Sequence, residues 1–133
     1  MIGPRLELQG AIVGRLQGDG ALSALVGKRV FDRVPADTKM PYVSMGPTEG
    51  ISDDADCIFA DNITFQIDCW SEDPGFVEVT KVAEAVEQAL DADLDLTVHA
   101  MALFRHRQTR VFRDRGAIIS HAVVTFEAII ERA

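Results

Sequence analysis

The sequence predicts an α+β fold: a mainly antiparallel sheet with a long C-terminal β-hairpin, flanked by an N-terminal helix and a central amphipathic helix. Three patterns predict it. Residues 62–69 alternate strictly between apolar and polar side chains, as a strand with one buried face does. Residues 76–90 repeat apolar side chains at the spacing of one helix face. Residues 96–112 and 117–131 have the pattern of two long strands joined near Asp114-Arg115-Gly116, a turn signal.

Length and composition predict one globular domain over residues 1–133. Apolar residues make up 47% and charged residues 26%, which excludes disorder and collagen-like repeats. No apolar run approaches the ~20 residues of a membrane-spanning helix, and Glu7 interrupts any signal peptide, so we expect a cytoplasmic protein without a membrane partner. Cys57 and Cys69 are expected to be free thiols of a reducing compartment, although the residues leave a disulfide between them open.

The first half of the chain predicts two helical segments and two short strands. Residues 5–17 carry a broad apolar stripe at helical spacing, and Ala21 to Val26 predicts one further helical turn. Gly10 and Gly14 lie four residues apart in the first helix, a spacing that lets another backbone approach closely. Residues 30–34 form the first strand candidate.

The segment that follows predicts a strand, a loop and a helix start. β character resumes over residues 42–45 and ends at Gly46-Pro47. Residues 49–58 form an acidic loop that carries Asp53, Asp54 and Asp56. Asp73 followed by Pro74 is the typical N-cap and first position of the central helix.

The length of the C-terminal hairpin suggests self-association. Fifteen strand residues extend ~50 Å, whereas a compact chain of this size has a diameter of only about 36 Å. A hairpin that projects from its own domain, apolar on both faces, needs a partner to cover it, which indicates oligomerisation by β-ribbon exchange or augmentation. The alternative is a strand broken by a bulge near Ser120 or His121.

Charge is segregated along the chain, within a net charge of −8. Residues 49–95 contain fourteen acidic groups against the single Lys81, whereas residues 96–116 contain five arginines against Asp114. Those arginines are Arg105, Arg107, Arg110, Arg113 and Arg115. Two interpretations stay open: copies associate head to tail through an acidic and a basic side, or the arginines neutralise the carboxylates within one monomer.

No pattern of residues indicates catalysis, a cofactor or a metal. Cys69 lies on the apolar face of its strand, and the carboxylates around Cys57 disfavour a reactive thiolate. His99 and His106 lack a third local ligand. The Asp91, Asp93 and Asp95 series resembles the start of a calcium loop, but Leu96 and Ala102 stand where that loop requires Gly and Glu. We therefore predict a protein that is not an enzyme and holds no cofactor.

The arginine-rich hairpin raises a second class of function. Phe104 and Phe112 interleave with the arginines, an arrangement that binds single-stranded nucleic acid. The net charge of −8 opposes phosphate binding. A small nucleic-acid-associated regulator that uses this hairpin is therefore the alternative hypothesis.

Several short stretches resemble a known family. They are Asp19-Gly20-Ala21-Leu22, the run from Leu25 to Asp32, Met40-Pro41-Tyr42-Val43-Ser44-Met45-Gly46, Trp70-Ser71, and the helix from Gly75-Phe76 through Ala89-Leu90. Over nearly the whole chain, and most specifically over residues 19–46, the sequence resembles the tail completion, or tail terminator, family of long-tailed phages and gene transfer agents.

The resemblance implies a ring-forming structural protein. It implies a hexameric ring of this chain that caps the tail tube, contacts the tail tube protein and the head-side connector or stopper protein, and meets DNA only in transit. It implies assembly in the cytoplasm and a place in the particle tail or neck, with no active site to transfer. On this view the five arginines pair with a neighbouring subunit or the tail tube. The acidic loop around Asp53, Asp54 and Asp56, or else the acidic helix face, lines the channel and repels passing DNA.

Overall fold

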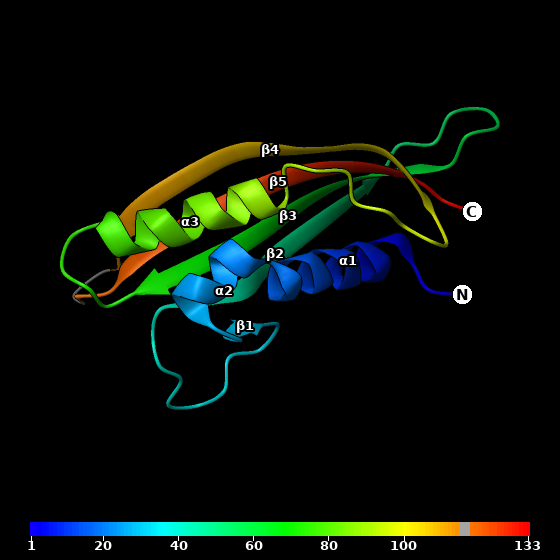
Figure 1. The fold of residues 1–133 in the computed structure, drawn as a ribbon. Helices are drawn as coiled ribbons and strands as arrows, with labels where there is room; N and C mark the ends of the chain where they lie inside the picture. Colours follow the sequence, from blue (N-terminus) through cyan, green and yellow to red (C-terminus); the bar gives the residue numbers. More distant parts are fainter. Residues whose placement is uncertain (115–117) are drawn as a thin grey trace.

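The computed structural model describes residues 1–114 and 118–133; Arg115, Gly116 and Ala117 lie outside the described residues. Among these, three helices and a five-stranded sheet confirm the α+β class (Figure 1). In chain order the elements are α1 (Pro4–Gly18), α2 (Gly20–Val26), β1 (Val30–Phe31), β2 (Tyr42–Ser52), β3 (Ala60–Ser71), α3 (Val77–Ala89), β4 (Ala100–Arg113) and β5 (Ser120–Glu131).

The strands are ordered β1-β2-β3-β5-β4, so β5 is interior and β4 is an edge strand. β1 runs parallel to β2, and every other pair is antiparallel. Phe65 of β3 lies opposite Phe126 of β5 at the centre of the sheet. The sheet is therefore mainly antiparallel, as its sequence pattern predicts.

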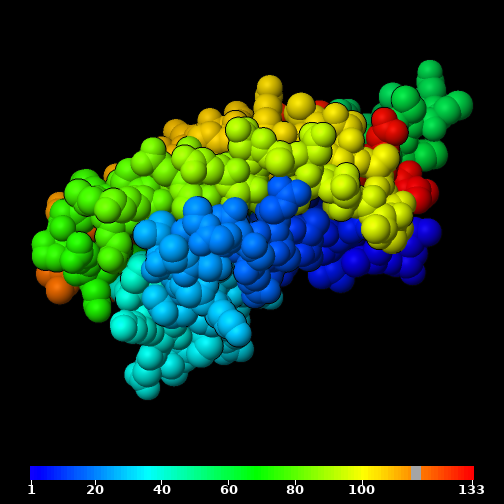
Figure 2. Space-filling view, viewed as in Figure 1, coloured from blue at the N-terminus to red at the C-terminus, as the bar shows by residue number. Residues whose placement is uncertain are grey.

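The helices cover one face of the sheet and leave the other face open (Figure 1). Alternate β5 residues from Ala122 to Ile130 are buried against the helices, and the residues between them are only half-buried. Leu8, Ile12 and Leu16 of α1 complete the same apolar core. The space-filling view shows the helical side chains packed closely over this face of an elongated body (Figure 2). No helix in the described part of the chain is long and apolar enough to span a membrane.

The first two helices form where the sequence predicts them. Pro4 occupies the first turn of α1, where its missing N–H costs nothing, and the Asp19 carboxylate caps α2 by accepting from the Leu22 N–H at 2.9 Å. The expected close approach at Gly10 and Gly14 is wrong. A Cβ at either position would meet nothing within 4 Å, because both glycines lie on the exposed side of α1.

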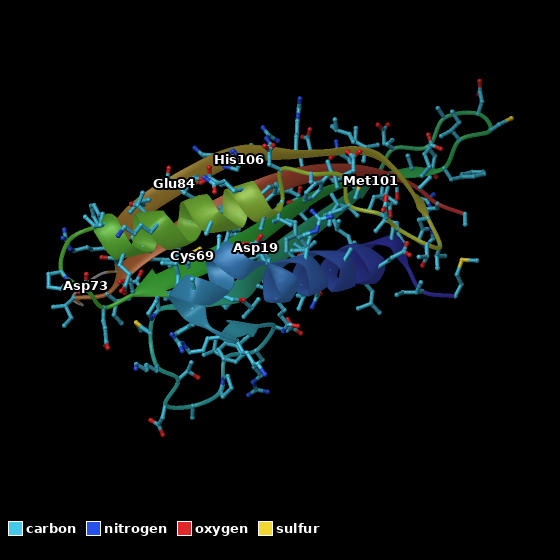
Figure 3. The ribbon with its side chains drawn as sticks, in the orientation of Figure 1. Asp19, Cys69, Asp73, Glu84, Met101 and His106 are labelled. Carbon is cyan, nitrogen blue, oxygen red and sulfur yellow. The ribbon has the colours of Figure 1, made fainter. Side chains whose placement is uncertain are left out.

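The predicted start of the central helix is wrong by one turn. α3 begins at Val77, and Asp73 and Pro74 lie in the turn before it (Figure 3). The Ser71 hydroxyl takes over local hydrogen bonding there: it accepts from the Asp73 N–H at 3.1 Å and donates to Glu78 at 2.7 Å. Gly75, with φ of 78°, then turns the chain into the helix.

Two predicted strands have different lengths in the structure. β1 ends at Phe31 rather than residue 34, because its register pairs it only with Val43 and Ser44. β2 continues past Gly46-Pro47 to Ser52, because a shift of register between Met45 and Thr48 accommodates the proline and pairing with β3 resumes. The acidic loop is accordingly shorter than residues 49–58 and occupies residues 53–59.

The C-terminal hairpin exists, but it does not project from its domain. β5 pairs with β3 continuously from Ser120 to Glu131, so the sheet itself is as long as the hairpin. The diameter of about 36 Å expected of a compact chain is too small here, because the body is elongated (Figure 2). The bulge considered near Ser120 or His121 is also wrong. The irregularities lie in β4, between Met101 and Leu103 and between His106 and Gln108.

β4 starts later than the predicted residue 96, for a specific reason. The Glu7 carboxylate accepts from the N–H groups of Thr97, Val98 and His99 at 2.8–2.9 Å. Because these N–H groups bond to a side chain of α1, they do not form hydrogen bonds with β5.

Candidate interaction surface

The described arginines of the charged segment all lie on β4, the edge strand of the sheet. Arg105 and Arg110 share the open face with their β5 partners Glu127 and Val123. Arg107 sits at the second register shift, and Arg113 lies at the end of the strand. The structure therefore brings Arg105, Arg107, Arg110 and Arg113 onto one exposed edge, whereas Arg115 lies outside the described residues.

Two of these arginines share one carboxylate. Arg105 Nη2 lies 2.9 Å from Glu127 Oε1, and Arg107 Nη1 lies 3.2 Å from Glu127 Oε2. Both arginine side chains are more than half exposed, at 61% and 53%, so water screens these pairs and each adds little to stability. One carboxylate between two guanidinium groups leaves positive charge available on this edge.

The other two arginines lie over aromatic rings. The Arg110 guanidinium is 5.4 Å from the centre of the Phe112 ring, and the Arg113 guanidinium is 4.5 Å from that of Phe76. Such contacts orient an arginine without neutralising it. We name Arg105, Arg107, Arg110 and Arg113 the arginine edge.

The acidic loop forms a small hairpin at one end of the molecule (Figure 1). A backbone pair joins Ala55 and Ile58, and the Asp53 N–H donates to the Ala60 carbonyl at 2.8 Å. Asp53, Asp54 and Asp56 are all exposed on it. The structure therefore brings the three predicted carboxylates together on one projecting tip.

Arg132 anchors the base of this tip. Its guanidinium donates to Asp54 at 2.8 Å, to the Ala60 carbonyl at 3.2 Å and to Asp61. The hydrogen bond that Arg132 donates to Asp54 and the charges of both carboxylates raise the pKa of Arg132. Asp54 is thus partly neutralised from within the chain.

The segregated charges form no ion pair with one another within residues 1–114 and 118–133. Among the described residues, the arginine edge forms ion pairs only with Glu127, and the acidic tip forms its ion pair with Arg132. Neutralisation of residues 49–95 by the arginines of residues 96–116, the second of the two open interpretations, therefore receives no support from the described ion pairs.

An aromatic row that sequence reasoning missed crosses the open face of the sheet. The Trp70 and His121 rings stack with centres 3.8 Å apart and planes inclined by 14°. Tyr42 lies beside Trp70 at 6.2 Å, Phe31 beside Tyr42 at 6.2 Å, and Phe112 beside His121 at 4.9 Å. The row thus includes one ring from each strand. The alternation of β3 already points Trp70 away from the core, but the partners of that ring depend on register between distant strands.

His121 lies between two carboxylates within this row. Its Nε2 is 2.7 Å from Asp68 Oδ1, and its Nδ1 is 3.3 Å from Asp114 Oδ1. Burial by itself lowers the pKa of His121, but the hydrogen bonds and charges of Asp68 and Asp114 outweigh burial and raise it. Burial, with the charge of Asp114, also raises the pKa of Tyr42.

The remaining candidate residues occupy separate places. Both cysteines are free: Cys57 is exposed on the acidic tip, and burial raises the pKa of Cys69 (Figure 3). The buried His99 ring bonds the Ile2 carbonyl at 2.8 Å and the Ala133 N–H at 3.0 Å, so it joins the two chain ends. The described residues contain no group of three His, Cys, Asp or Glu side chains arranged to hold a metal ion.

A polar cleft of about 760 Å³ lies between residues 90–96 and the first half of β4. Its lining includes the carboxylates Asp91, Asp93 and Asp95 together with Arg105 and His106. The calcium-like series thus borders an open, mixed-charge cleft.

Large exposed apolar side chains lie at both ends of the elongated body. Ile51, Ile58 and Phe59 are exposed on and beside the acidic tip, at the end of the body where both chain termini lie (Figure 1). Phe76 and Val77 are exposed at the opposite end, where α3 begins. These exposed apolar side chains are candidate contact surfaces at the two ends.

Comparison with known proteins identifies the family. The family model described as "Tail completion protein gp17" matches residues 10–131. The chain belongs to the tail completion protein gp17 family. A solved structure described as the virion of a native gene transfer agent (GTA) particle contains a chain similar to this family member. The TM-score is 0.86 and the identity 29%, over 93% of this chain and 94% of that one. A search of curated proteins finds no match.

The family resemblance expected from residues 19–46 and the helix that ends at Leu90 is therefore confirmed. Membership in this family makes the chain a structural component of a tail. Its notable features are accordingly surfaces: the arginine edge, the acidic tip and the open sheet face with its aromatic row.

Proposed function

We propose that this chain is the ring-forming tail terminator of a phage-like particle, in which six copies cap the finished tail tube and join it to the head-side connector or stopper. The observation that carries the proposal is the match, over 93% of the chain, to a chain of a gene transfer agent virion. The tail or neck of the particle is then its final location, after assembly in the cytoplasm. The role requires no bond-making chemistry.

The surfaces of the monomer support self-association. Apolar side chains are exposed at both ends of the body, and β4 leaves one edge of the sheet unpaired within the chain. Two different contact surfaces on one chain generate a ring when the rotation between copies closes. We assign the arginine edge, together with Arg115, to the contact with a neighbouring subunit or the tail tube protein.

Tails assembled without this protein test the proposed role. Negative-stain microscopy is expected to show over-long tails or tails that lack heads, and supply of the wild-type chain is expected to restore length and joining. Tails of normal length joined to heads in its absence would contradict the proposal.

Charge reversal tests the arginine edge. The double variant Arg107→Glu/Arg110→Glu is expected to stay folded, because both side chains are exposed, but to fail in restoring head joining. The matched control is Arg33→Glu/Lys39→Glu, which changes the net charge equally in the exposed loop between β1 and β2. If the two variants restored head joining equally well, the assignment of the arginine edge to the assembly contact would be wrong.

We assign Asp53, Asp54 and Asp56 of the acidic tip to the channel wall, where carboxylates repel DNA in transit. Asp53→Lys/Asp56→Lys is expected to leave head joining intact and to slow DNA delivery. The parallel variant Glu84→Lys/Glu87→Lys places the same charge change on the acidic face of α3. Slowed delivery with that second variant alone would assign the channel wall to the acidic helix face instead.

The alternative, a nucleic-acid-associated regulator, makes a different prediction. Such a protein shifts labelled DNA at physiological salt and remains at one or two copies in light scattering. Glu127 between Arg105 and Arg107, and the net charge of −8, both weaken phosphate binding by the arginine edge.

A further inference from the structure

His121 has an environment that family membership does not explain. It is half-buried on the open face of β5, stacked on Trp70, with one carboxylate at each ring nitrogen. Asp68 comes from β3, and Asp114 comes from the segment just after β4. One side chain therefore connects three parts of the sheet.

The hydrogen-bond inventory of imidazole decides what this geometry requires. A neutral ring has one N–H donor and one acceptor nitrogen, whereas a protonated ring donates from both nitrogens. Ionised carboxylates only accept. Both contacts of His121 are therefore satisfied together only when the ring carries two N–H groups.

The two contacts differ in strength. The Asp68 contact is shorter, at 2.7 Å against 3.3 Å, and the Asp68 side chain is 9% exposed against 34% for Asp114. Gln66 also donates to the same Asp68 oxygen at 3.0 Å, which fixes that carboxylate in place. A ring with a single N–H thus keeps it on Nε2 and turns the Nδ1 lone pair toward Asp114.

We propose that His121 is a protonation-dependent clasp that holds the end of the β4–β5 hairpin against β3. With the proton on Nδ1, the ring bridges Asp68 and Asp114. When that proton leaves for solvent, the Asp114 carboxylate faces a lone pair and is released. The proposal does not depend on the proposed role in tail assembly.

Release of Asp114 has a defined local consequence. The Asp114 N–H donates to the Ile119 carbonyl at 3.1 Å, the bond that closes the hairpin next to the last β4–β5 pair, Arg113 and Ser120. Loss of the clasp weakens that closing bond and the alignment of the adjoining end of the arginine edge.

Other groups around the ring shape the transition. Tyr42 of β2 lies behind Trp70 and is neutral in this pH range, because its pKa is raised. Arg110 of β4 lies over Phe112, whose ring is next to His121. The two carboxylates favour protonation and outweigh burial, in agreement with the raised pKa of His121.

Nuclear magnetic resonance of the full ¹⁵N-labelled chain tests the clasp. At about pH 6 the His121 ring is expected to carry protons on both nitrogens, and its titration is expected above the usual histidine pKa of about 6.5. Hydroxide catalyses amide hydrogen exchange, so exchange accelerates with pH at every amide. As the His121 ring loses its proton, the exchange of the Asp114 amide is expected to accelerate severalfold beyond this general increase.

Two variants separate the clasp from a general charge effect. Asp114→Asn is expected to lower the His121 midpoint and to abolish the extra acceleration of exchange. Asp73→Asn removes an exposed carboxylate from the same end of the molecule and is expected to leave both unchanged (Figure 3). A neutral ring at about pH 6, exchange that follows hydroxide catalysis throughout, or equal effects of the two variants would each overturn the proposal.

Discussion

Glu7 of α1 is the residue that connects the N-terminal helix to the beginning of β4. Its carboxylate accepts four hydrogen bonds: from the N–H groups of Thr97, Val98 and His99, and from the Thr97 hydroxyl at 3.2 Å. Burial alone raises the pKa of Glu7, but these donors outweigh it and lower the pKa overall. One charged side chain therefore organises a loop that lies some ninety residues later in the sequence.

Glu7→Gln is expected to lower the melting temperature, because an amide replaces a charged acceptor opposite four donors. A lowered folded-state pKa stabilises the fold above the unfolded value of about 4.3, and this stabilisation is lost as pH falls through the folded pKa. The difference in melting temperature between wild type and variant is therefore expected to be full at neutral pH and to shrink in acid.

Glu84→Gln on the exposed side of α3 is the matched control, and calorimetry across pH measures both variants (Figure 3). An equal loss in the two variants would show that the Glu7 contacts have no special role.

At the scale of elements, α1 tolerates two glycines that nothing in the structure requires. Gly10 and Gly14 have ordinary helical backbone and open space where a Cβ would stand. Each glycine in a helix interior costs up to about 1 kcal/mol relative to alanine. α1 therefore contributes less to stability than its sequence length allows.

Gly14→Ala is expected to stabilise the protein by about 0.5–1 kcal/mol. Gly27→Ala is the contrasting variant, since Gly27 has a φ of 61° and any Cβ there is strained. Urea denaturation is expected to shift the two midpoints in opposite directions. Destabilisation by Gly14→Ala would mean that α1 packs against something on its exposed side.

At the scale of the whole molecule, one apolar core connects the helices with every strand of the sheet. Its buried side chains extend from Leu8 in α1 to Ile130 in β5. Phe126, fully buried, lies at its centre opposite Phe65 and stacks with Phe104 at 5.3 Å. We therefore expect residues 1–133 to behave as one domain.

Unfolding is expected to occur in a single transition that far-ultraviolet and near-ultraviolet dichroism report together. Phe126→Ala is expected to shift the whole transition with a loss of about 3–5 kcal/mol, because it opens a cavity between the sheet and the helices. Two separate transitions, or a loss confined to one spectral region, would contradict a single domain.

Sequence reasoning succeeded where the determinants are local. The alternation of residues 62–69 and the helical spacing of residues 5–17 reflect which face of each element is buried, and both recur in the structure. It failed where another side chain, near or distant in the sequence, competes for the backbone. The Glu7 carboxylate binds N–H groups just before β4, so that strand starts later than predicted. The Ser71 hydroxyl accepts from the Asp73 N–H, in the turn where Asp73 was expected to cap α3.

The candidate surfaces divide in the same way. The sequence places the arginines on one strand and Asp53, Asp54 and Asp56 on one loop, because each group is contiguous in the chain. It does not predict that Glu127 lies between Arg105 and Arg107, or that Arg132 neutralises Asp54. Those pairs depend on register between strands and on the position of the chain end.

The α+β class, the main helices and strands, the segregation of charge and the family follow from the amino-acid sequence, since all of these reside in local pattern and local residue order. The folded chain was needed to reveal three further features: the interior position of β5, the aromatic row from Phe31 to Phe112 and the site of His121 between Asp68 and Asp114. Each of these joins residues from strands far apart in the chain. Such contacts depend on strand order and register, and the energy that selects them comes from packing the whole core at once.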